Sequence, residues 1–482
     1  MTPELLFSHM ALIQPELLLA VGAMVVLMVG AFGGDRSFRM ITWLSVAVLI
    51  GAGALAVITA PLQQTLIFGG SYAVDTFGAY AKLVIAFTSA SALLLAVDWL
   101  EERRIARPEF PVLAVLAVLG MYVMVSAHDL IALYLGVELQ SLALYVLAAY
   151  ARDDAKSSEA GLKYFVLGAL SSGLLLYGCS LVYGFTGSVK FDVIAQALTG
   201  ETHNVGALFG MVFILCGLAF KMSAAPFHMW TPDVYEGSPT PSTAFFATAP
   251  KVAAAILFAR VCFEAFGPLQ GDWVMIVSIM AVMSMGIGAL FALQQTNIKR
   301  LLAYSSIANM GYALVAVAAG PEVGSRALLV FVAIYAVTSL GLFGIVLSMR
   351  GAQGQGLEKI SDMAGLSRTR PMLALALTVL VFSVMGIPPL AGFFGKWEVF
   401  GAAVAGGVIH LALVLVIASV ISAFYYLRIM KTVWFDAPDV TVLGTPPATA
   451  ITLTGTTLVL AAITPLVGLI AGAAAIAAAS LR

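Results

Sequence analysis

The feature that most constrains this chain is a series of long apolar runs, separated by short breaks that hold charged residues, proline or glycine. Each run has about 20 residues, the length at which a helix rising 1.5 Å per residue crosses a hydrocarbon core of roughly 30 Å. Only 10% of the residues are charged, whereas soluble domains carry roughly 25%. The sequence therefore predicts an all-α integral membrane protein and excludes a water-soluble fold.

The runs predict about fourteen transmembrane helices, with ends uncertain by a few residues. The longest connections, near 184–205, 349–371 and 431–449, leave no room for a soluble domain. The predicted helices lie near 12–32, 40–60, 76–98, 109–126, 130–150, 161–183, 206–227, 241–263, 273–293, 300–319, 326–348, 372–402, 405–430 and 450–475.

Loop charges predict the orientation, because lysine and arginine favour the cytoplasmic side of a membrane. One set of alternate loops, which includes neither terminus, holds most of them: Arg36, Arg39, Arg103, Arg104, Arg107, Arg152, Lys156, Lys299, Arg300, Arg350, Lys359, Arg368, Arg370, Arg428 and Lys431. The other set, which includes both termini, holds Lys190, Arg326 and Arg482. Both termini are therefore predicted on the outer face of a bacterial inner membrane.

The remaining basic residues lie within the predicted helices or at their ends: Lys82, Lys163, Lys221, Lys251, Arg260 and Lys396. A charge at the bilayer centre costs at least about 2.5–3.5 kcal/mol, so it persists mainly beside a partner or a polar pathway. Lys82 and Arg260 lie close to helix ends, and we expect them to reach the interface by snorkelling. Lys251 lies deeper in its helix and follows Pro250, so it is the clearest candidate for a functional buried cation.

Two of these lysines lie beside helices that prolines must interrupt. Lys221 precedes Pro226 and Pro232, and Lys396 follows the pair at 388–389. Unwound backbone at membrane depth is tolerated where it lines a cavity, and half-helix ends bind charge. One broken helix in each half of the chain is typical of a transporter with internal repeats.

The buried lysines could form structural ion pairs, but Glu138 is the only acid near the middle of a predicted span. Burial disfavours the charged ammonium, so a surplus of buried lysines favours groups that exchange protons. His228 could relay a proton between Lys221 and Lys251, or could equally be a polar plug near a helix end. His128 and Asp129 are interpreted as interfacial residues.

Redox and metal chemistry are not predicted for this chain. Cys179, Cys216 and Cys262 lie apart in apolar runs, and the five histidines have no paired ligand spacing. No glycine-rich dinucleotide motif follows a strand, and no nucleic-acid partner is predicted. We therefore expect no metal site and no cofactor site in this chain.

Three motifs carry a resemblance to a known family. They are Phe220-Lys221 to Lys251, containing Pro226-Phe227-His228, Trp230, Pro232-Asp233-Val234-Tyr235 and Ala249-Pro250-Lys251; Lys299-Arg300-Leu301-Leu302-Ala303-Tyr304; and Gly386-Ile387-Pro388-Pro389 to Gly395-Lys396. Along essentially the whole chain, the sequence resembles the subunit N family of proton-translocating NADH:quinone oxidoreductase, respiratory complex I, an antiporter-like subunit family.

The resemblance implies two inverted five-helix repeats, helices 4–8 at 109–263 and helices 9–13 at 273–430. Each repeat contains one broken helix, which is helix 7 of the chain in the first repeat and helix 12 in the second. N-terminal helices in 1–108 precede these repeats and a helix at 450–475 follows them. The resemblance also implies a proton relay in which Glu138 pairs with Lys221 and Lys251 is the central lysine. Lys163 matches the lysine that modulates this relay in the family, and Lys396 matches the lysine nearest the proton exit. His228 belongs to the same motif.

The implied role is proton pumping beside other membrane-arm subunits, while NADH, FMN, iron–sulfur clusters and quinone are bound elsewhere in the complex. A subunit of a multisubunit cation/proton antiporter is the alternative. Such relatives usually have Pro-Asp-Ala-His where this chain has Pro232-Asp233-Val234-Tyr235. A structural membrane scaffold is a third reading, which the buried lysines argue against.

Overall fold

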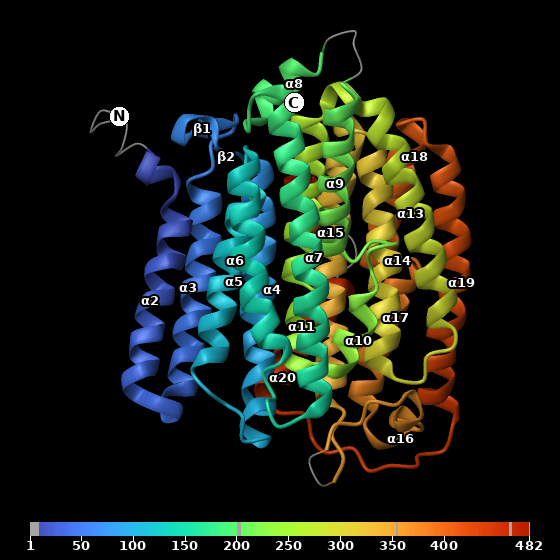
Figure 1. Cartoon of the computed structure of the whole chain (residues 1–482). Helices are drawn as coiled ribbons and strands as arrows, with labels where there is room; N and C mark the ends of the chain where they lie inside the picture. Colours follow the sequence, from blue (N-terminus) through green and yellow to red (C-terminus); the bar gives the residue numbers. More distant parts are fainter. Residues whose placement is uncertain (1–8, 200–203, 353–354, 462–464, 482) are drawn as a thin grey trace.

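The computed structural model describes residues 9–199, 204–352, 355–461 and 465–481. Within these residues the chain is a bundle of long helices with one short β-hairpin (Figure 1). Eleven segments of the described chain are long and apolar enough to cross a membrane. One of these segments, Gln14–Ile58, contains two helices joined by a 3-10 turn. The all-α membrane class is confirmed, whereas the number of fourteen spans and the repeat boundaries stay predictions.

The N-terminal part holds α2 (Gln14–Gly33), α3 (Phe38–Ile58) and α4 (Thr76–Glu102). A hairpin of β1 (Thr65–Ile67) and β2 (Tyr72–Val74), which the sequence did not indicate, lies between α3 and α4. The helices that follow are α5 (Glu109–Ser126), α6 (Leu130–Ala148), α7 (Ala155–Thr186), α8 (Phe191–Ala197), α9 (Val205–Met222), α10 (Trp230–Gly237), α11 (Thr240–Phe246) and α12 (Ala249–Arg260).

The second half of the chain continues with helices of similar length. It holds α13 (Gln270–Ala292), α14 (Ile298–Ala318), α15 (Pro321–Ser348), α16 (Leu366–Thr369), α17 (Pro371–Met385), α18 (Ala391–Ala405), α19 (Ile409–Phe435), α20 (Pro447–Ala461) and α21 (Pro465–Ala479). The described residues of the helix predicted at 450–475 belong to α20 and α21, and its continuity as one helix stays a prediction. Residues 462–464 of that prediction, and Arg482, lie outside the described residues.

The two helices that prolines were expected to interrupt are both interrupted. The first stops at Met222, where Ser223 has φ 64°, and resumes as α10 at Trp230. The second stops at Met385 and resumes as α18 at Ala391. Each break contains a cis proline peptide, Ala225-Pro226 and Pro388-Pro389.

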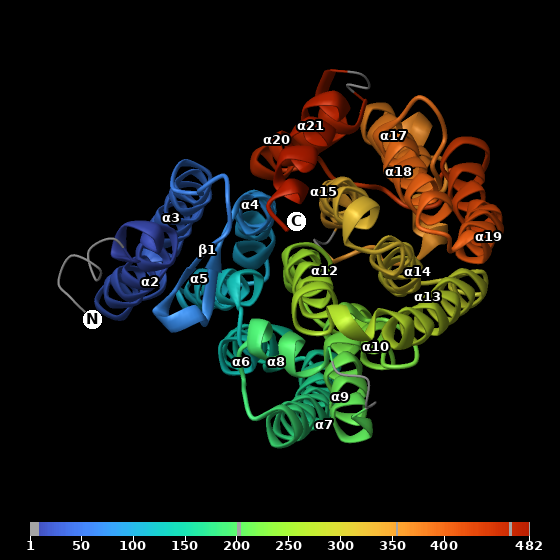
Figure 2. The ribbon, with the colours of Figure 1, turned by 90° about the horizontal axis from the view of Figure 1, so that it is seen from above.

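The most deeply buried helices lie at the centre of the bundle. Seen from above, α12, α14 and α15 occupy the middle, while α2 and α3 lie at one edge beside α4 and α5 (Figure 2). The apolar windows of Thr240–Ala265 and Ile298–Ala318 are completely buried, in contrast to the peripheral Ile409–Phe435. The broken helices and their lysines therefore surround a core that lipid does not reach.

Glycine residues allow α13 and α14 to cross closely. A Cβ on Gly288 of α13 would lie 2.5 Å from the backbone nitrogen of Ala308, and one on Gly311 of α14 would lie 2.9 Å from that of Met285. These separations are far below van der Waals contact, so α13 and α14 pack backbone to backbone. Small residues allow such approaches between membrane helices, where apolar burial alone drives little association.

We predict that Gly288→Leu destabilises the bundle by about 1–3 kcal/mol, the usual cost of overpacking a buried site. Thermal unfolding of the purified protein within its membrane complex measures the effect. Gly286→Leu is the matched control, because a Cβ on Gly286 meets no atom within 4 Å and leucine favours the helix. Equal loss in both variants would contradict the close-crossing explanation.

Candidate functional site

Lys221 lies in the last turn of α9, just before the first break. Its Nζ donates to Ser141 Oγ at 2.7 Å and to the Tyr145 hydroxyl at 3.4 Å, both on α6. Lys221 is only 5% exposed. The sequence therefore places a buried ammonium against two hydroxyls at the end of a half-helix.

Glu138 lies on α6, almost one turn before Ser141, and accepts a hydrogen bond from Ser172 of α7. The resemblance implies a Glu138–Lys221 pair, but these two described side chains form no direct ion pair. Instead, the carboxylate of Glu138 accepts from a hydroxyl of α7, whereas the ammonium of Lys221 donates to hydroxyls of α6. Serine and tyrosine hydroxyls both donate and accept, so they can connect the two groups.

Lys251 was expected deep within one helix, but this span is divided into α11 and α12, so Lys251 lies in the first turn of α12, where it is 1% exposed. Its Nζ donates to the carbonyl oxygen of Met222, the last residue of α9, at 3.1 Å, and to Ser223 Oγ. Ser223 also accepts from Thr231 at 2.6 Å, and the amine lies 4.8 Å from the Trp230 ring centroid. The ammonium is thus held by the carbonyl end of a half-helix, a hydroxyl and an aromatic face, all of which favour a cation.

Lys396 of α18 has the same kind of environment at the second break. Its Nζ donates to the carbonyl oxygen of Met385, the last residue of α17, at 3.0 Å. It also donates to Ser419 Oγ of α19 at 3.3 Å and lies 5.0 Å from the Tyr312 ring centroid. Each interrupted helix therefore ends on a carbonyl group that a buried lysine satisfies.

Hydroxyl side chains occupy the region between Lys251 and Lys396, along α14. Ser306 bonds the Tyr335 hydroxyl at 2.7 Å, Ser305 bonds Tyr426, and Tyr312 bonds Ser419 at 3.2 Å, which in turn contacts Lys396. A cavity of about 10 Å³ is lined by Ser305, Ser306, Tyr335 and Ser339. A volume of this size holds about one water molecule. These hydroxyls were not among the residues predicted from the sequence, although the Ser305-Ser306 pair lies inside an apolar run.

Lys163 lies apart from this buried group. Its side chain is 42% exposed and forms ion pairs of 2.8 Å with Glu159 and with Asp233 of α10. Asp233 also pairs with Arg300 at 2.8 Å, and these residues line an open pocket of about 170 Å³. The structure therefore does not bring Lys163 together with the other candidate lysines, but links it to them through α10.

His228 lies in the first break, half-buried, and no hydrogen bond joins it to Lys221 or Lys251 in the described chain. Its Nδ1 is buried without a partner. The relay and plug roles of His228 both stay predictions.

The prediction that Lys82 and Arg260 snorkel to the interface is wrong. Arg260 is 0% exposed, and its guanidinium contacts Asp75 at 2.9 Å and Glu264 at 2.8 Å. Lys82 is also buried and pairs with Glu16 of α2 at 2.7 Å. Asp75 and Glu16 come from distant segments, so the position of Arg260 and Lys82 near helix ends could not reveal these partners.

His128, interpreted as interfacial, is 4% exposed and pairs with Glu264 at 2.9 Å. Its neighbour Asp129 caps α6 by accepting from the Ala132 amide. The described part of the chain holds no group of three or more metal-ligating side chains arranged around a common point. The three cysteines are free.

Comparison with known proteins places this geometry in a class. Residues 127–422 match the family described as NADH:quinone oxidoreductase/Mrp antiporter, TM. The fold also matches a chain of respiratory complex I from Thermus thermophilus with a TM-score of 0.82 at 30% identity, covering 96% of this chain and 99% of that chain. A chain of the Mrp complex from Dietzia matches with a TM-score of 0.85 at 23% identity, over 98% and 97% of the two chains, which shows a shared fold.

The fold and the lysines at its broken helices define an antiporter-like membrane subunit. An NADH-quinone oxidoreductase subunit N from Rhizobium meliloti is 53% identical over 91% of each chain, and one from Maricaulis maris is 54% identical over 91% of each. The chain belongs to the NADH-quinone oxidoreductase subunit N family.

We predict that Asp75→Asn strongly destabilises the protein, because it removes a carboxylate that accepts two hydrogen bonds from one nitrogen of the buried Arg260 guanidinium and leaves Glu264 as its remaining acidic partner. Breaking a buried pair typically costs about 3–5 kcal/mol. Thermal unfolding of the solubilised complex measures the loss. Asp436→Asn is the control, since Asp436 pairs with Lys431 at the surface and such a pair contributes about 0–1 kcal/mol. Equal melting temperatures for the two variants would argue against a structural role for the Arg260 cluster.

Proposed function

We propose that this chain translocates protons as a membrane subunit of NADH:quinone oxidoreductase, through a relay that contains Glu138, Lys221, Lys251 and Lys396. Its relatives are named as subunit N of that enzyme, and the likeness extends over 91% of this chain in one such relative and 96% in the solved complex I chain. The redox reaction takes place in other subunits, which bind NADH, FMN, iron–sulfur clusters and quinone. This chain supplies the ionisable groups within the membrane.

The observation that carries the proposal is the contact of Lys251 with the broken end of α9. A neutral amine there can accept a proton from one side, and the resulting ammonium is stabilised by the Met222 carbonyl, Ser223 and the Trp230 ring. Loss of that proton toward α14 restores the amine. Each lysine gains one N–H proton and then loses it to the next group, so charge moves while every side chain returns to its starting state.

Helix α10 connects the buried site with the open pocket around Lys163. Asp233 faces that pocket, whereas Trp230 and Tyr235 of the same helix lie near the Lys251 amine. We propose that protons enter from this charged pocket, with Lys163 setting the charge of Asp233. The excess of loop lysines and arginines supports a cytoplasmic position for this pocket and an outer position for both termini.

Neighbouring membrane-arm subunits and the bilayer surround the chain in this proposal. The alternative of a cation/proton antiporter subunit has the same fold, as the Dietzia structure shows. At 23% identity that likeness concerns the fold alone, while relatives above 50% identity belong to the oxidoreductase. Sodium-dependent proton movement by the assembled complex would favour the alternative.

We predict that Lys251→Ala assembles normally but lowers proton translocation and coupled quinone reduction by roughly 100-fold, the lower part of the range for a positioned acid–base group. Glu138→Ala should act in the same direction. Proton uptake and quinone reduction by the complex in proteoliposomes measure both activities. Lys431→Ala is the control, because Lys431 is 70% exposed. Full pumping stoichiometry in either variant would remove that residue from the obligatory relay.

The hydroxyls of α14 yield a separate prediction. Tyr335→Phe removes only the hydroxyl that bonds Ser306, and we expect about fivefold slower proton translocation, corresponding to about 1 kcal/mol for one hydrogen bond. The rate of proton uptake per enzyme is compared with that of Tyr183→Phe, whose ring is exposed. An unchanged rate would show that the route from Lys251 to Lys396 does not pass through Tyr335.

A further inference from the structure

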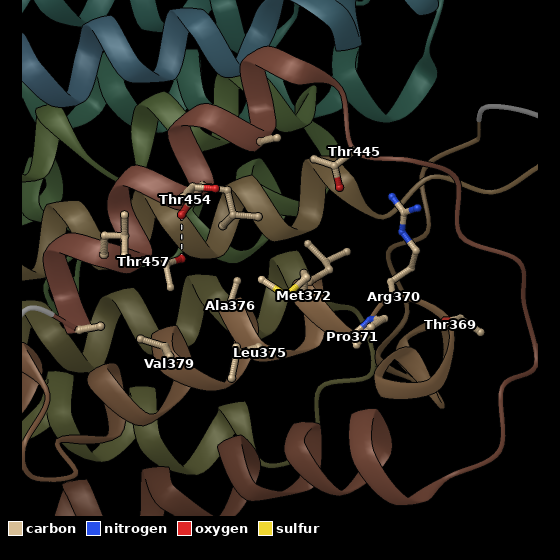
Figure 3. Close-up of a pocket in the computed structure, with 15 residues that line it drawn as sticks. Thr369, Arg370, Pro371, Met372, Leu375, Ala376, Val379, Thr445, Thr454 and Thr457 are labelled. Atoms are coloured by element: carbon tan, nitrogen blue, oxygen red, sulfur yellow. Dashed lines mark hydrogen bonds between the residues drawn. The ribbon is translucent and has the colours of Figure 1, made fainter.

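An apolar groove runs between α17 and α20, outside the proton relay. Figure 3 shows side chains of both helices facing one another along it, with Leu375, Ala376 and Val379 on α17 and Thr454 and Thr457 on α20. Its volume is about 620 Å³, within the range of roughly 300–1,000 Å³ that is typical of small-molecule sites. From Pro371 to Val379 the lining extends about 12 Å along α17 at 1.5 Å per residue.

One end of the groove is charged. Arg370, the residue before α17, lines that end together with Thr445 (Figure 3). Within the described residues Arg370 has no acidic partner, whereas Arg350 and Arg326 are paired with Glu102 and Glu398. An unpaired guanidinium at the mouth of an apolar groove is complementary to a ligand with an anionic head and a hydrocarbon tail.

The groove also lies at the membrane depth that such a ligand occupies. Arg370 directly precedes α17, a shorter apolar helix, at the end of the bundle that carries α16 (Figure 1). Basic pockets between transmembrane helices on this side of a membrane bind anionic lipid head groups. The walls from Leu375 to Val379 then lie where an acyl chain lies in the same leaflet.

We propose that this groove binds one anionic phospholipid, with its phosphate at Arg370 and an acyl chain between α17 and α20. The lipid holds two helices that otherwise leave a gap. Because α17 ends at Met385, whose carbonyl accepts from Lys396, the lipid also fixes the half-helix that supports the second broken site.

The test uses the assembled complex and phosphatidylglycerol that carries a photoreactive group on an acyl chain. After illumination, mass spectrometry locates the labelled peptides. We expect labelling of 371–379 and 445–461, with competition by unlabelled phosphatidylglycerol and weak competition by phosphatidylcholine. Labelling confined to other helices, or absent because a neighbouring subunit fills the groove, would overturn the proposal.

Two variants and a matched control separate the head group from the tail. Arg370→Gln should reduce labelling about fivefold, since one basic residue near an anionic lipid contributes about 1 kcal/mol. Ala376→Trp should reduce it by filling the groove. Arg368→Gln is the control, because Arg368 is exposed and does not line the groove.

Equal labelling in Arg370→Gln, with phosphatidylcholine competing as well as phosphatidylglycerol, would reduce the site to unselective lipid contact and overturn the proposal. If Arg370→Gln does not assemble, competition between the two lipids on the unaltered complex decides the matter. Proton pumping plays no part in this test, so its result is independent of the relay.

Discussion

The hydrogen bond between a lysine and the last carbonyl of a half-helix is the interaction on which the interior depends. A helix that stops inside a membrane leaves backbone groups that water cannot satisfy, each of which costs several kcal/mol. At each break a buried lysine donates to one of these free carbonyls: Lys251 to that of Met222 and Lys396 to that of Met385. The same bond also gives the buried ammonium an acceptor. The interrupted helix and the buried charge therefore lower each other's desolvation cost.

Other freed backbone groups are satisfied by side chains from neighbouring helices. The Trp230 indole donates to the Phe220 carbonyl, and Ser284 of α13 accepts from the Ala225 amide. At the second break, the Gly392 amide donates to Ser383 Oγ. Side chains of the neighbouring helices and of the resumed half-helix therefore satisfy several of the backbone groups that the two breaks free.

Sequence reasoning located the lysines and both breaks, because proline and charge inside an apolar run are local signals. It failed where a partner is distant in the sequence. Arg260 was expected at the interface, since nothing near it shows that Asp75, 185 positions away, would bury against it. Likewise, the exposure of Lys163 depends on which face of α7 meets α10, and the hydroxyl contacts of α14 depend on helix rotation, which short apolar patterns do not determine.

Helix α10 joins two environments of opposite character within eight residues. Its Asp233 belongs to a surface ion-pair network, while Trp230 lies stacked on Tyr164 and faces the Lys251 amine. Any tilt of so short a helix that followed a rearrangement of the surface ion pairs would also displace the Trp230 ring beside the Lys251 amine. Helix α10, about two turns long, thus provides a mechanical connection by which a change in the surface ion pairs can alter the proton affinity of the Lys251 amine.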